Sequence, residues 1–454
     1  AFGRLLRVDE PDAAGTLIET ARYNYDVMGR MTTVQMGLRA DGTFKQTRTF
    51  VYNTAGQLTS ATNPENGTVS YTYFADGLPQ SKTDAKSQTQ WFVYDLYHRL
   101  LRIESPQGVT KTSFTYDTNP GFPTTYAGGK MTSASNDGYT WHYAYDIMGR
   151  VNKQTLQTPA AIYAQASYWY DQDGRLGQFN YPGAMDTAAN VQPGVLYQHT
   201  YDLLGRQLTT AYFDSVYSIS VPRAQNAQYN AAGQLTSWEE NLPYPNHTLY
   251  TTLTRSYNDQ RGWVNNIRAV PYGSQAVLDL TYNYLANGQA SSVTDAVNPG
   301  QSVSLYEYDE LNRLKKATAA NWALQWTYDE FGNRLTQTKV PGSPGTPPEI
   351  TLSYGETTNR ITTAGYTYDL NGNLTAMPGL TVAFDVFDRA ATINGTAAKY
   401  DAYGRRVAYG SRVFFCCTIG RLMAEYLGTF AGVTPSRRIE YFAGQRLGEY
   451  TDRL

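Results

Sequence analysis

The sequence predicts an all-β protein in which an array of antiparallel hairpins forms one continuous, spiralling β-sheet wall, either a hollow shell or part of one. Three observations lead to this prediction. A short tyrosine-containing motif recurs along the whole chain of 454 residues. Tyrosine is as frequent as glycine, with 39 copies of each, which suits strands that pack aromatic rings between tight turns. Segments ahead of the motif, such as residues 70–73, alternate with a period of two, as expected of a strand with two unlike faces.

The motif reads Tyr, Asp or Asn, two variable residues, Gly, and a polar residue that is usually Arg or Gln. Its predicted structural residues are Tyr25, Asp26, Gly29, Arg30, Tyr52, Gly56, Tyr145, Asp146, Gly149, Arg150, Tyr170, Asp171, Gly174, Arg175, Tyr201, Asp202, Gly205, Arg206, Tyr229, Gly233, Tyr328, Asp329, Gly332, Tyr368, Asp369, Gly372, Tyr400, Asp401, Gly404 and Arg405. Degenerate copies begin at Tyr73, Tyr94, Tyr116, Tyr257, Tyr284, Tyr308 and Tyr354. The chain therefore reads as one uniform array of repeats.

Each part of the motif has a physical role in a hairpin. The Asp or Asn side chain accepts hydrogen bonds from nearby backbone N–H groups, and Gly accepts the positive φ that a short hairpin turn needs. One repeat is then two strands, with a second and longer connection to the next hairpin. A lone hairpin is barely stable in water, so each unit needs its neighbours to bury tyrosines and pair backbone groups.

The number of repeats bounds the size of the sheet. About 17 repeats give roughly 34 strands, which at about 4.8 Å per strand form a sheet on the order of 160 Å wide. Strands coil as they accumulate, and large numbers of strands enclose a lumen instead of a filled core. A curved or spiralling wall is the expected product.

Composition argues against several classes of function. With 37 basic and 39 acidic side chains, the net charge of −2 provides no field for nucleic acid or an acidic membrane. No stretch reaches the roughly 18 apolar residues of a membrane span. The sequence lacks a nucleophile elbow, a phosphate-binding loop and a dinucleotide fingerprint, so we predict no enzyme activity and no cofactor.

The charged residues of the motif have a structural interpretation and a functional alternative. The recurring aspartates are expected to cap turns, although a glycosidase would need two of them to converge in one cleft. The motif arginines are expected to pack and form salt links, although they could also line a groove that binds sugars or nucleic acid by stacking. No metal spacing links the four histidines, which are His98, His142, His199 and His247.

Three other features stand out from the repeats. Cys416 and Cys417 are adjacent, and we expect two small hydrophobic residues, with a vicinal disulfide as the alternative. The segments 341–348 and 181–194 are predicted to be long loops. The first residues, AFGRLLRV, match the second half of a motif, and the chain ends without a capping element. We therefore expect further repeats beyond both ends.

Taken together, these motif copies resemble the YD-repeat family over nearly the whole chain. This family includes the Rhs (rearrangement hot spot) proteins, wall-associated toxins, the shell subunits of Tc toxin complexes and the teneurins. The resemblance implies a hollow cage, plugged by an Rhs-associated core, around a C-terminal toxin cargo from the same precursor. It divides the chain into a shell at residues 1–438 and a lead-in to the core at 439–454.

The resemblance also implies a setting and a partner. It favours a secreted, extracellular or cell-surface protein of bacterial origin that encloses its own cargo. The cleavage aspartates of the family's core have no matching position in this sequence. The alternative function is a teneurin-like adhesion or carbohydrate-binding module with surface glycans as partners, and a hydrolase hidden in the array is a third hypothesis.

Overall fold

The computed structural model describes residues 3–11, 15–119, 122, 125–187, 193–214, 219–241, 250–429 and 431–450. Within these residues the protein has 38 β-strands and a three-residue 3-10 turn, Pro299–Gln301, and no α-helix. The predicted all-β class is therefore confirmed. None of the described segments is a helix long and apolar enough to cross a membrane.

The chain divides into two compact units. Unit 1 consists of Ala1–Val93, Glu104–Val109 and Leu280–Gly395, and unit 2 of Tyr94–Ile103, Thr110–Asp279 and Thr396–Leu454. Strands of unit 1, two of which extend past its boundary, are β1 (Arg7–Pro11), β2 (Leu17–Tyr25), β3 (Met31–Leu38), β4 (Phe44–Tyr52), β5 (Leu58–Asn63), β6 (Gly67–Tyr73), β7 (Pro79–Thr83), β8 (Thr89–Tyr94), β22 (Leu278–Tyr284), β23 (Ala290–Asp295), β24 (Val303–Tyr308), β25 (Leu314–Ala319), β26 (Ala323–Tyr328), β27 (Arg334–Lys339), β28 (Ile350–Thr351), β29 (Thr367–Tyr368), β30 (Leu374–Met377), β31 (Leu380–Phe384) and β32 (Ala390–Ile393).

Unit 2 contains the remaining strands. They are β9 (Leu100–Glu104), β10 (Thr110–Tyr116), β11 (Met131–Asn136), β12 (Tyr139–Tyr145), β13 (Val151–Gln157), β14 (Tyr163–Tyr170), β15 (Leu176–Pro182), β16 (Pro193–Tyr201), β17 (Gln207–Asp214), β18 (Ile219–Tyr229), β19 (Leu235–Asn241), β20 (Tyr250–Tyr257), β21 (Val264–Pro271), β33 (Thr396–Tyr400), β34 (Arg406–Tyr409), β35 (Arg412–Cys416), β36 (Leu422–Leu427), β37 (Pro435–Phe442) and β38 (Gln445–Tyr450).

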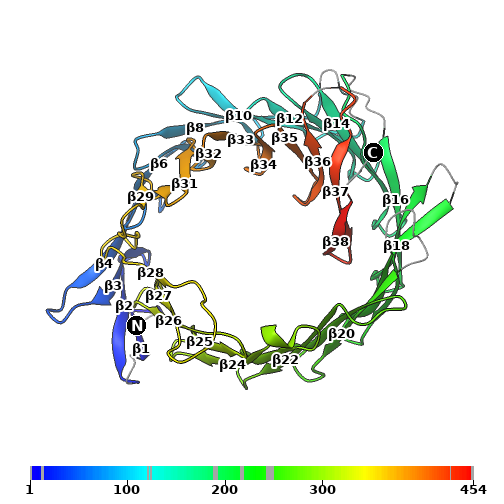
Figure 1. Cartoon of the computed structure of the whole chain (residues 1–454). Coiled ribbons are helices and arrows are strands. Elements are labelled where there is room, and N and C mark those ends of the chain that lie inside the picture. Colours follow the sequence, from blue (N-terminus) through cyan, green and yellow to red (C-terminus); the bar gives the residue numbers. More distant parts are fainter. Residues whose placement is uncertain are drawn as a thin grey trace. The chain divides into compact units, whose positions relative to one another are not determined.

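The strands form two antiparallel sheets. Strands β1–β28 belong to a 28-stranded sheet and β29–β38 to a ten-stranded sheet, so the last ten strands do not simply extend the first wall. Strands that follow one another in sequence pair with each other, as β2 pairs with β3 and β13 with β14. Figure 1 shows β33–β37, in orange and red, beside β10–β16 of the first sheet in unit 2. Each unit therefore has two layers.

The Tyr-Asp turns share one geometry. In the β2–β3 hairpin, the Gly29 N–H donates to the carbonyl of Asp26 at 2.9 Å, and Asp26 and Arg30 also pair through their backbones. The register then shifts at Tyr25, which pairs with Met31. This is a type I turn followed by a glycine in the left-handed region, with a bulge. The glycines of the nine clear motifs have φ values from +77° to +86°.

The two layers are held together differently in the two units. In unit 2, an apolar cluster spans both sheets, and Trp141 of β12 packs edge-on against Phe415 of β35 with ring centroids 4.9 Å apart. In unit 1, polar contacts join the layers: Gln46 donates to Asn359 at 2.9 Å, and Lys86 pairs with Asp369 at 3.1 Å. Unit 2 therefore has the larger hydrophobic core among the described residues.

Connections partly follow the predictions. Residues 341–348 lie between β27 and β28 as a loop, as expected of a segment with four prolines. The loop predicted at 181–194 is shorter than expected, because residues 181–182 belong to β15 and residues 193–194 to β16. Residues 188–192 of the predicted loop lie outside the described residues. The links between hairpins are often as short as the Tyr-Asp turns, as at residues 84–88 between β7 and β8. The expected longer second connection is therefore not a general feature.

We expect His98→Gly to raise the free energy of unfolding by about 0.5–1 kcal/mol. His98 occupies the glycine position of its motif with φ of +61°. The left-handed conformation costs a side-chain-bearing residue roughly 1–2 kcal/mol, more than the roughly 0.4–1 kcal/mol that glycine adds through unfolded-chain entropy. Urea denaturation measures the change.

Gly174→Ala is the matched control for this substitution. Gly174 has φ of +80°, and a Cβ there would meet no atom closer than 3.6 Å, so only the backbone conformation opposes alanine. It should destabilise the chain by about 1 kcal/mol. Equal signs for the two substitutions would contradict the assignment of strain to this turn position.

Candidate functional site: the Tyr-Asp-Arg clamp

The motif aspartate closes its own turn. In the first clear motif, one oxygen of Asp26 accepts hydrogen bonds from the backbone N–H groups of Met28 and Arg30, both at 2.9 Å. Its other oxygen accepts from Nε of Arg30 at 2.6 Å. The same ion pair recurs at 2.6–2.8 Å in the motifs that begin with Asp95, Asp146, Asp171, Asp202, Asp309, Asp385 and Asp401.

The motif arginine reaches from its own turn to the next repeat. The guanidinium of Arg175 lies over the ring of Tyr201 at 5.1 Å and donates to the carbonyl of Asp202 at 3.4 Å. Arginine and the next tyrosine are arranged in the same way at Arg30–Tyr52, Arg99–Tyr116, Arg150–Tyr170, Arg206–Tyr229 and Arg313–Tyr328. Each arginine therefore combines an ion pair with a cation–π contact.

The tyrosine hydroxyl completes the link in the opposite direction. Tyr201 donates to the carbonyl of Leu176 at 2.9 Å, which is the first residue of the strand that follows the previous turn. Tyr170 bonds Val151 at 2.8 Å in the same way. Burial raises the pKa of Tyr201, Asp171 raises it further and Arg175 opposes the change, so the hydroxyl remains a donor at neutral pH. We call this set of aspartate, arginine and next tyrosine the clamp.

Other motif copies use variants of the clamp. Gln57 and Gln234 replace arginine after Gly56 and Gly233, and they still reach the next turn, at the carbonyls of Gly77 and Gly262. In two other motifs an asparagine follows the glycine in place of arginine. After Gly332, Asn333 donates to Asp329 at 2.9 Å, and after Gly372, Asn373 donates to Asp369 at 3.1 Å. Tyr328 bonds the carbonyl of Leu314, whereas Tyr368 accepts a backbone N–H from Ile361.

The clamp of Asp401 differs because it is buried between the layers of unit 2. The Asp401 side chain is 1% exposed, and Arg405 donates to it at 2.7 Å. It also accepts a hydrogen bond from the indole of Trp141 in the first sheet at 3.0 Å. Arg405 then donates to the carbonyl of Cys417 at 3.2 Å. The turn element has thus become a junction between two sheets.

Two copies of the motif escaped sequence reasoning. In residues 384–389, Phe384 replaces tyrosine, while Asp385 and Arg389 pair at 2.8 Å. In residues 416–421, Cys416 and Cys417 occupy the Tyr and Asp positions before Gly420 and Arg421. The spacing of Gly420, Arg421 and Leu422 was the available signal. Both cysteines are free, and burial raises the pKa of Cys416 to about 11.

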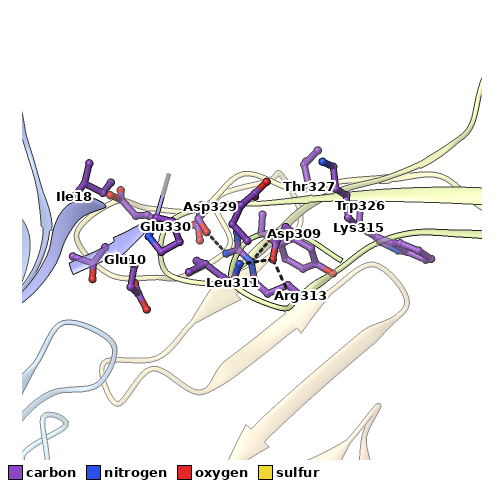
Figure 2. Close-up of a pocket in the computed structure, with 14 residues that line it drawn as sticks. Glu10, Ile18, Asp309, Leu311, Arg313, Lys315, Trp326, Thr327, Asp329 and Glu330 are labelled. Carbon is purple, nitrogen blue, oxygen red and sulfur yellow. Dashed lines mark hydrogen bonds and ion pairs between the residues drawn. The ribbon is translucent and has the colours of Figure 1, made fainter. Parts of the chain in front are cut away.

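A cavity of about 380 Å³ in unit 1 tests the hydrolase hypothesis, because several carboxylates line it (Figure 2). Asp309 bonds the N–H groups of Leu311 and Arg313 and the Arg313 side chain, and Asp329 closes its own turn. Burial opposes the change, but hydrogen bonds from Arg313 hold the pKa of Asp309 below its ordinary value. A general acid needs a raised pKa. The two aspartates therefore act as turn caps here.

The described histidines have structural surroundings. His142 stacks on Phe122 with ring centroids 3.6 Å apart and bonds Gln157 at 2.8 Å, and burial lowers its pKa. Burial also lowers the pKa of His199, to about 4. His247 lies outside the described residues. Nowhere in the described part of the chain do three or more His, Cys, Asp or Glu residues gather as a metal site would require.

We expect Asp401→Ala to lower the free energy of unfolding by about 3–5 kcal/mol, because it leaves a partly buried arginine and an indole N–H without their acceptor. Urea denaturation followed by tryptophan fluorescence measures this. Asp171→Ala is the matched control, since it removes the same motif residue from a clamp whose side chains are each 29% exposed. A loss for Asp171→Ala as large as that for Asp401→Ala would contradict the role of burial.

Known proteins have a similar fold. Residues 11–184 match the family described as Teneurin YD-shell. The crystal structure of TcdB2-TccC3 superposes with a TM-score of 0.75 at 14% identity, covering 100% of this chain and 25% of that one. The Photorhabdus luminescens Tc holotoxin pore with a TccC3 mutation gives a TM-score of 0.74 at 15% identity, covering 95% and 24%. No curated protein matches the sequence.

The likeness to the Tc structures, at 14–15% identity, concerns the fold. The chain spans about a quarter of the length of those structures. The repeated motif, the turns that it forms and the family match at residues 11–184 all indicate the same family of repeats. The resemblance to the YD-repeat and Rhs proteins that the motif indicates is therefore confirmed, and the chain has the YD-shell fold.

Proposed function

We propose that this chain is a segment of an encapsulating shell in a secreted YD-repeat protein, and that the shell encloses a C-terminal cargo domain of the same precursor. The observation that carries the proposal is the clamp, which with its variants ties neighbouring repeats together at many places along the wall. The fold likeness to TcdB2-TccC3 supports it, because one of these structures is described as lacking a hypervariable C-terminal region.

The chemistry of the wall suits enclosure better than catalysis. The aspartates that recur most often are bonded to their own turns, and their arginines are bonded to them. Despite burial, hydrogen bonds from Arg313 hold the pKa of Asp309 below its ordinary value, which leaves this carboxylate a poor proton donor at neutral pH. A wall whose motif aspartates and arginines are bonded to each other suits a barrier better than a reactive site.

The remaining parts of the proposal follow from the family resemblance. Residues 439–454 serve as the lead-in to an Rhs-associated core, and residues 1–438 as the shell. The partners are the cargo, the core and further repeats, and the setting is secreted, extracellular or on the cell surface of a bacterium. The cleavage that frees the cargo takes place outside this segment.

A second function is favoured by one observation. Several Tyr-Asp turns carry exposed apolar pairs at their tips, including Val27 and Met28 in unit 1, and Ile147, Met148, Leu203 and Leu204 in unit 2, all at least 74% exposed. Exposed apolar groups mark interaction surfaces where neighbouring turns join them into one contiguous patch. An adhesion role like that of the teneurins would place its partner on these tips. The faces of the motif tyrosines are already covered by arginines, which argues against sugar stacking there.

The shell proposal predicts protease protection of the cargo. In the full-length precursor, sequence downstream of residue 454 should resist proteinase K at least about tenfold longer than the same cargo expressed alone, because proteolysis needs access to an open chain. Mass spectrometry of the digestion products over time measures this. A destabilised precursor with Asp401→Ala serves as a control that should lose protection. Equal digestion rates for enclosed and free cargo would rule out enclosure.

A further inference from the structure

The second layer of unit 1 buries almost no side chains. We call residues 354–395, which include β29–β32 and are all described, the strap. Its one buried side chain, Asn371, is polar. Both apolar clusters of buried residues in the described chain lie in unit 2, where β33–β36 bury Phe415 and Tyr426 completely. Burial of apolar surface is the main stabilising term in a protein interior, so the strap lacks the contribution that holds β33–β36 in place.

Hydrogen bonds join the strap to the first sheet instead. Asn371 donates to a carboxylate oxygen of Asp84 at 2.7 Å, and its own side-chain oxygen accepts from the backbone N–H of Lys86 at 3.1 Å. Gln90 of β8 donates to the carbonyl of Val386 at 2.7 Å. Figure 1 shows β29, β31 and β32, in yellow and orange, beside β6 and β8 of this sheet. Water can bond each of these groups once the layers separate, so the net contribution of each bond to the junction is small.

The first part of the strap makes contacts of the same kind with β4 and the turn after β5. Gln46 of β4 donates to the carbonyl of Glu356 at 3.0 Å and to the side chain of Asn359 at 2.9 Å. Arg360 donates to the carbonyl of Glu65 at 2.8 Å. The strap therefore meets the first sheet through polar groups at several places along its length.

Ion pairs between the two layers place the cation on the first sheet and the carboxylate on the strap. Lys86 pairs with Asp369 at 3.1 Å, and Arg39 and Lys45 pair with Glu356 at 3.4 and 3.6 Å. These side chains are 17–60% exposed, so dissolved ions reach them and screen the attraction. Apolar contacts such as those of β33–β36 carry no charge to screen, and salts do not weaken them in this way.

The strands of the strap add little stability of their own. β29 has two residues, and β30, β31 and β32 have four, five and four. Hairpins this short are marginal in water unless another layer packs on them. Amides of the strap should therefore exchange with solvent once it leaves the first sheet.

We propose that the strap is a salt-sensitive flap, which leaves the first sheet while unit 2 stays folded. In the closed state Lys86 is paired with Asp369. In the open state water bonds both groups, and the face of the first sheet that carries Gln46 and Gln90 is exposed. Because screening weakens the closed state alone, a higher salt concentration shifts the equilibrium toward the open state.

Hydrogen exchange of the whole chain at one pH, in roughly 0.05 M and roughly 1 M NaCl, tests the flap, with rates corrected for the effect of salt on intrinsic exchange. Amides of β30–β32 should be at least about 100-fold less protected than those of β34–β36. Higher salt should lower the protection of β30–β32 by a further factor of about three to ten, the effect of a few partly exposed ion pairs, and leave β34–β36 unchanged. Equal protection of the two sets, or strap protection that does not respond to salt, would overturn the proposal.

Two lysine variants separate the flap from general effects of salt. Lys86→Ala should lower the protection of β30–β32 about two- to fivefold and reduce its response to salt, with β34–β36 unchanged. Lys82→Ala is the matched control, since Lys82 of β7 bonds no strap residue in the described chain, and it should behave as the wild type. Wild-type protection and salt response in Lys86→Ala would contradict the proposal. If Lys86→Ala does not fold, the wild-type comparison of β30–β32 with β34–β36 decides.

Discussion

The wall depends on a turn that most repeats close with the side chain of an Asp or Asn. Where the pair is Asp and Arg, the aspartate also aims the arginine at the next repeat. Because the aspartate accepts from two backbone amides and from the arginine, the guanidinium is held over the neighbouring tyrosine without further ordering cost. The bulge after the turn sets the tyrosine in register. A hairpin that is only marginally stable alone is thus held in place by contacts with the next hairpin.

This local chemistry explains what could be predicted from sequence. The motif carries its own turn, so the all-β class, the hairpins and the clamped repeats follow from Asp171, Gly174 and Arg175 and their equivalents. At Cys416 and Cys417 the Tyr and Asp are replaced, but Gly420 keeps its position in the motif. The turn persists there because its backbone hydrogen bonds and the glycine form it. A search for Tyr followed by Asp or Asn therefore misses this copy, which only the position of Gly420 and Arg421 indicates.

The pairing of the two sheets could not be read from the motif. Trp141 meets Asp401, and Tyr181 meets Ile439, across more than 250 positions of sequence, and nothing in either repeat marks its partner. Unit 1 uses polar contacts and unit 2 an apolar cluster for the same task. Such long-range choices depend on complementary side chains, which no period in the sequence reveals.

The protonation of a carboxylate in this fold depends on its burial and on the arginine that bonds it. At Asp171 the pair is partly exposed, each acid has one base, and the pKa is lowered despite burial. At Asp401 the pair is buried but still one to one, and an indole adds a third contact. At Glu440 the pair with Arg223 is also buried, and the hydroxyl of Tyr197 donates to the second carboxylate oxygen. Glu240 has no such ion pair among the described contacts, and burial raises its pKa. A buried carboxylate of this wall thus stays charged where a guanidinium bonds it directly, and is more easily protonated where none does.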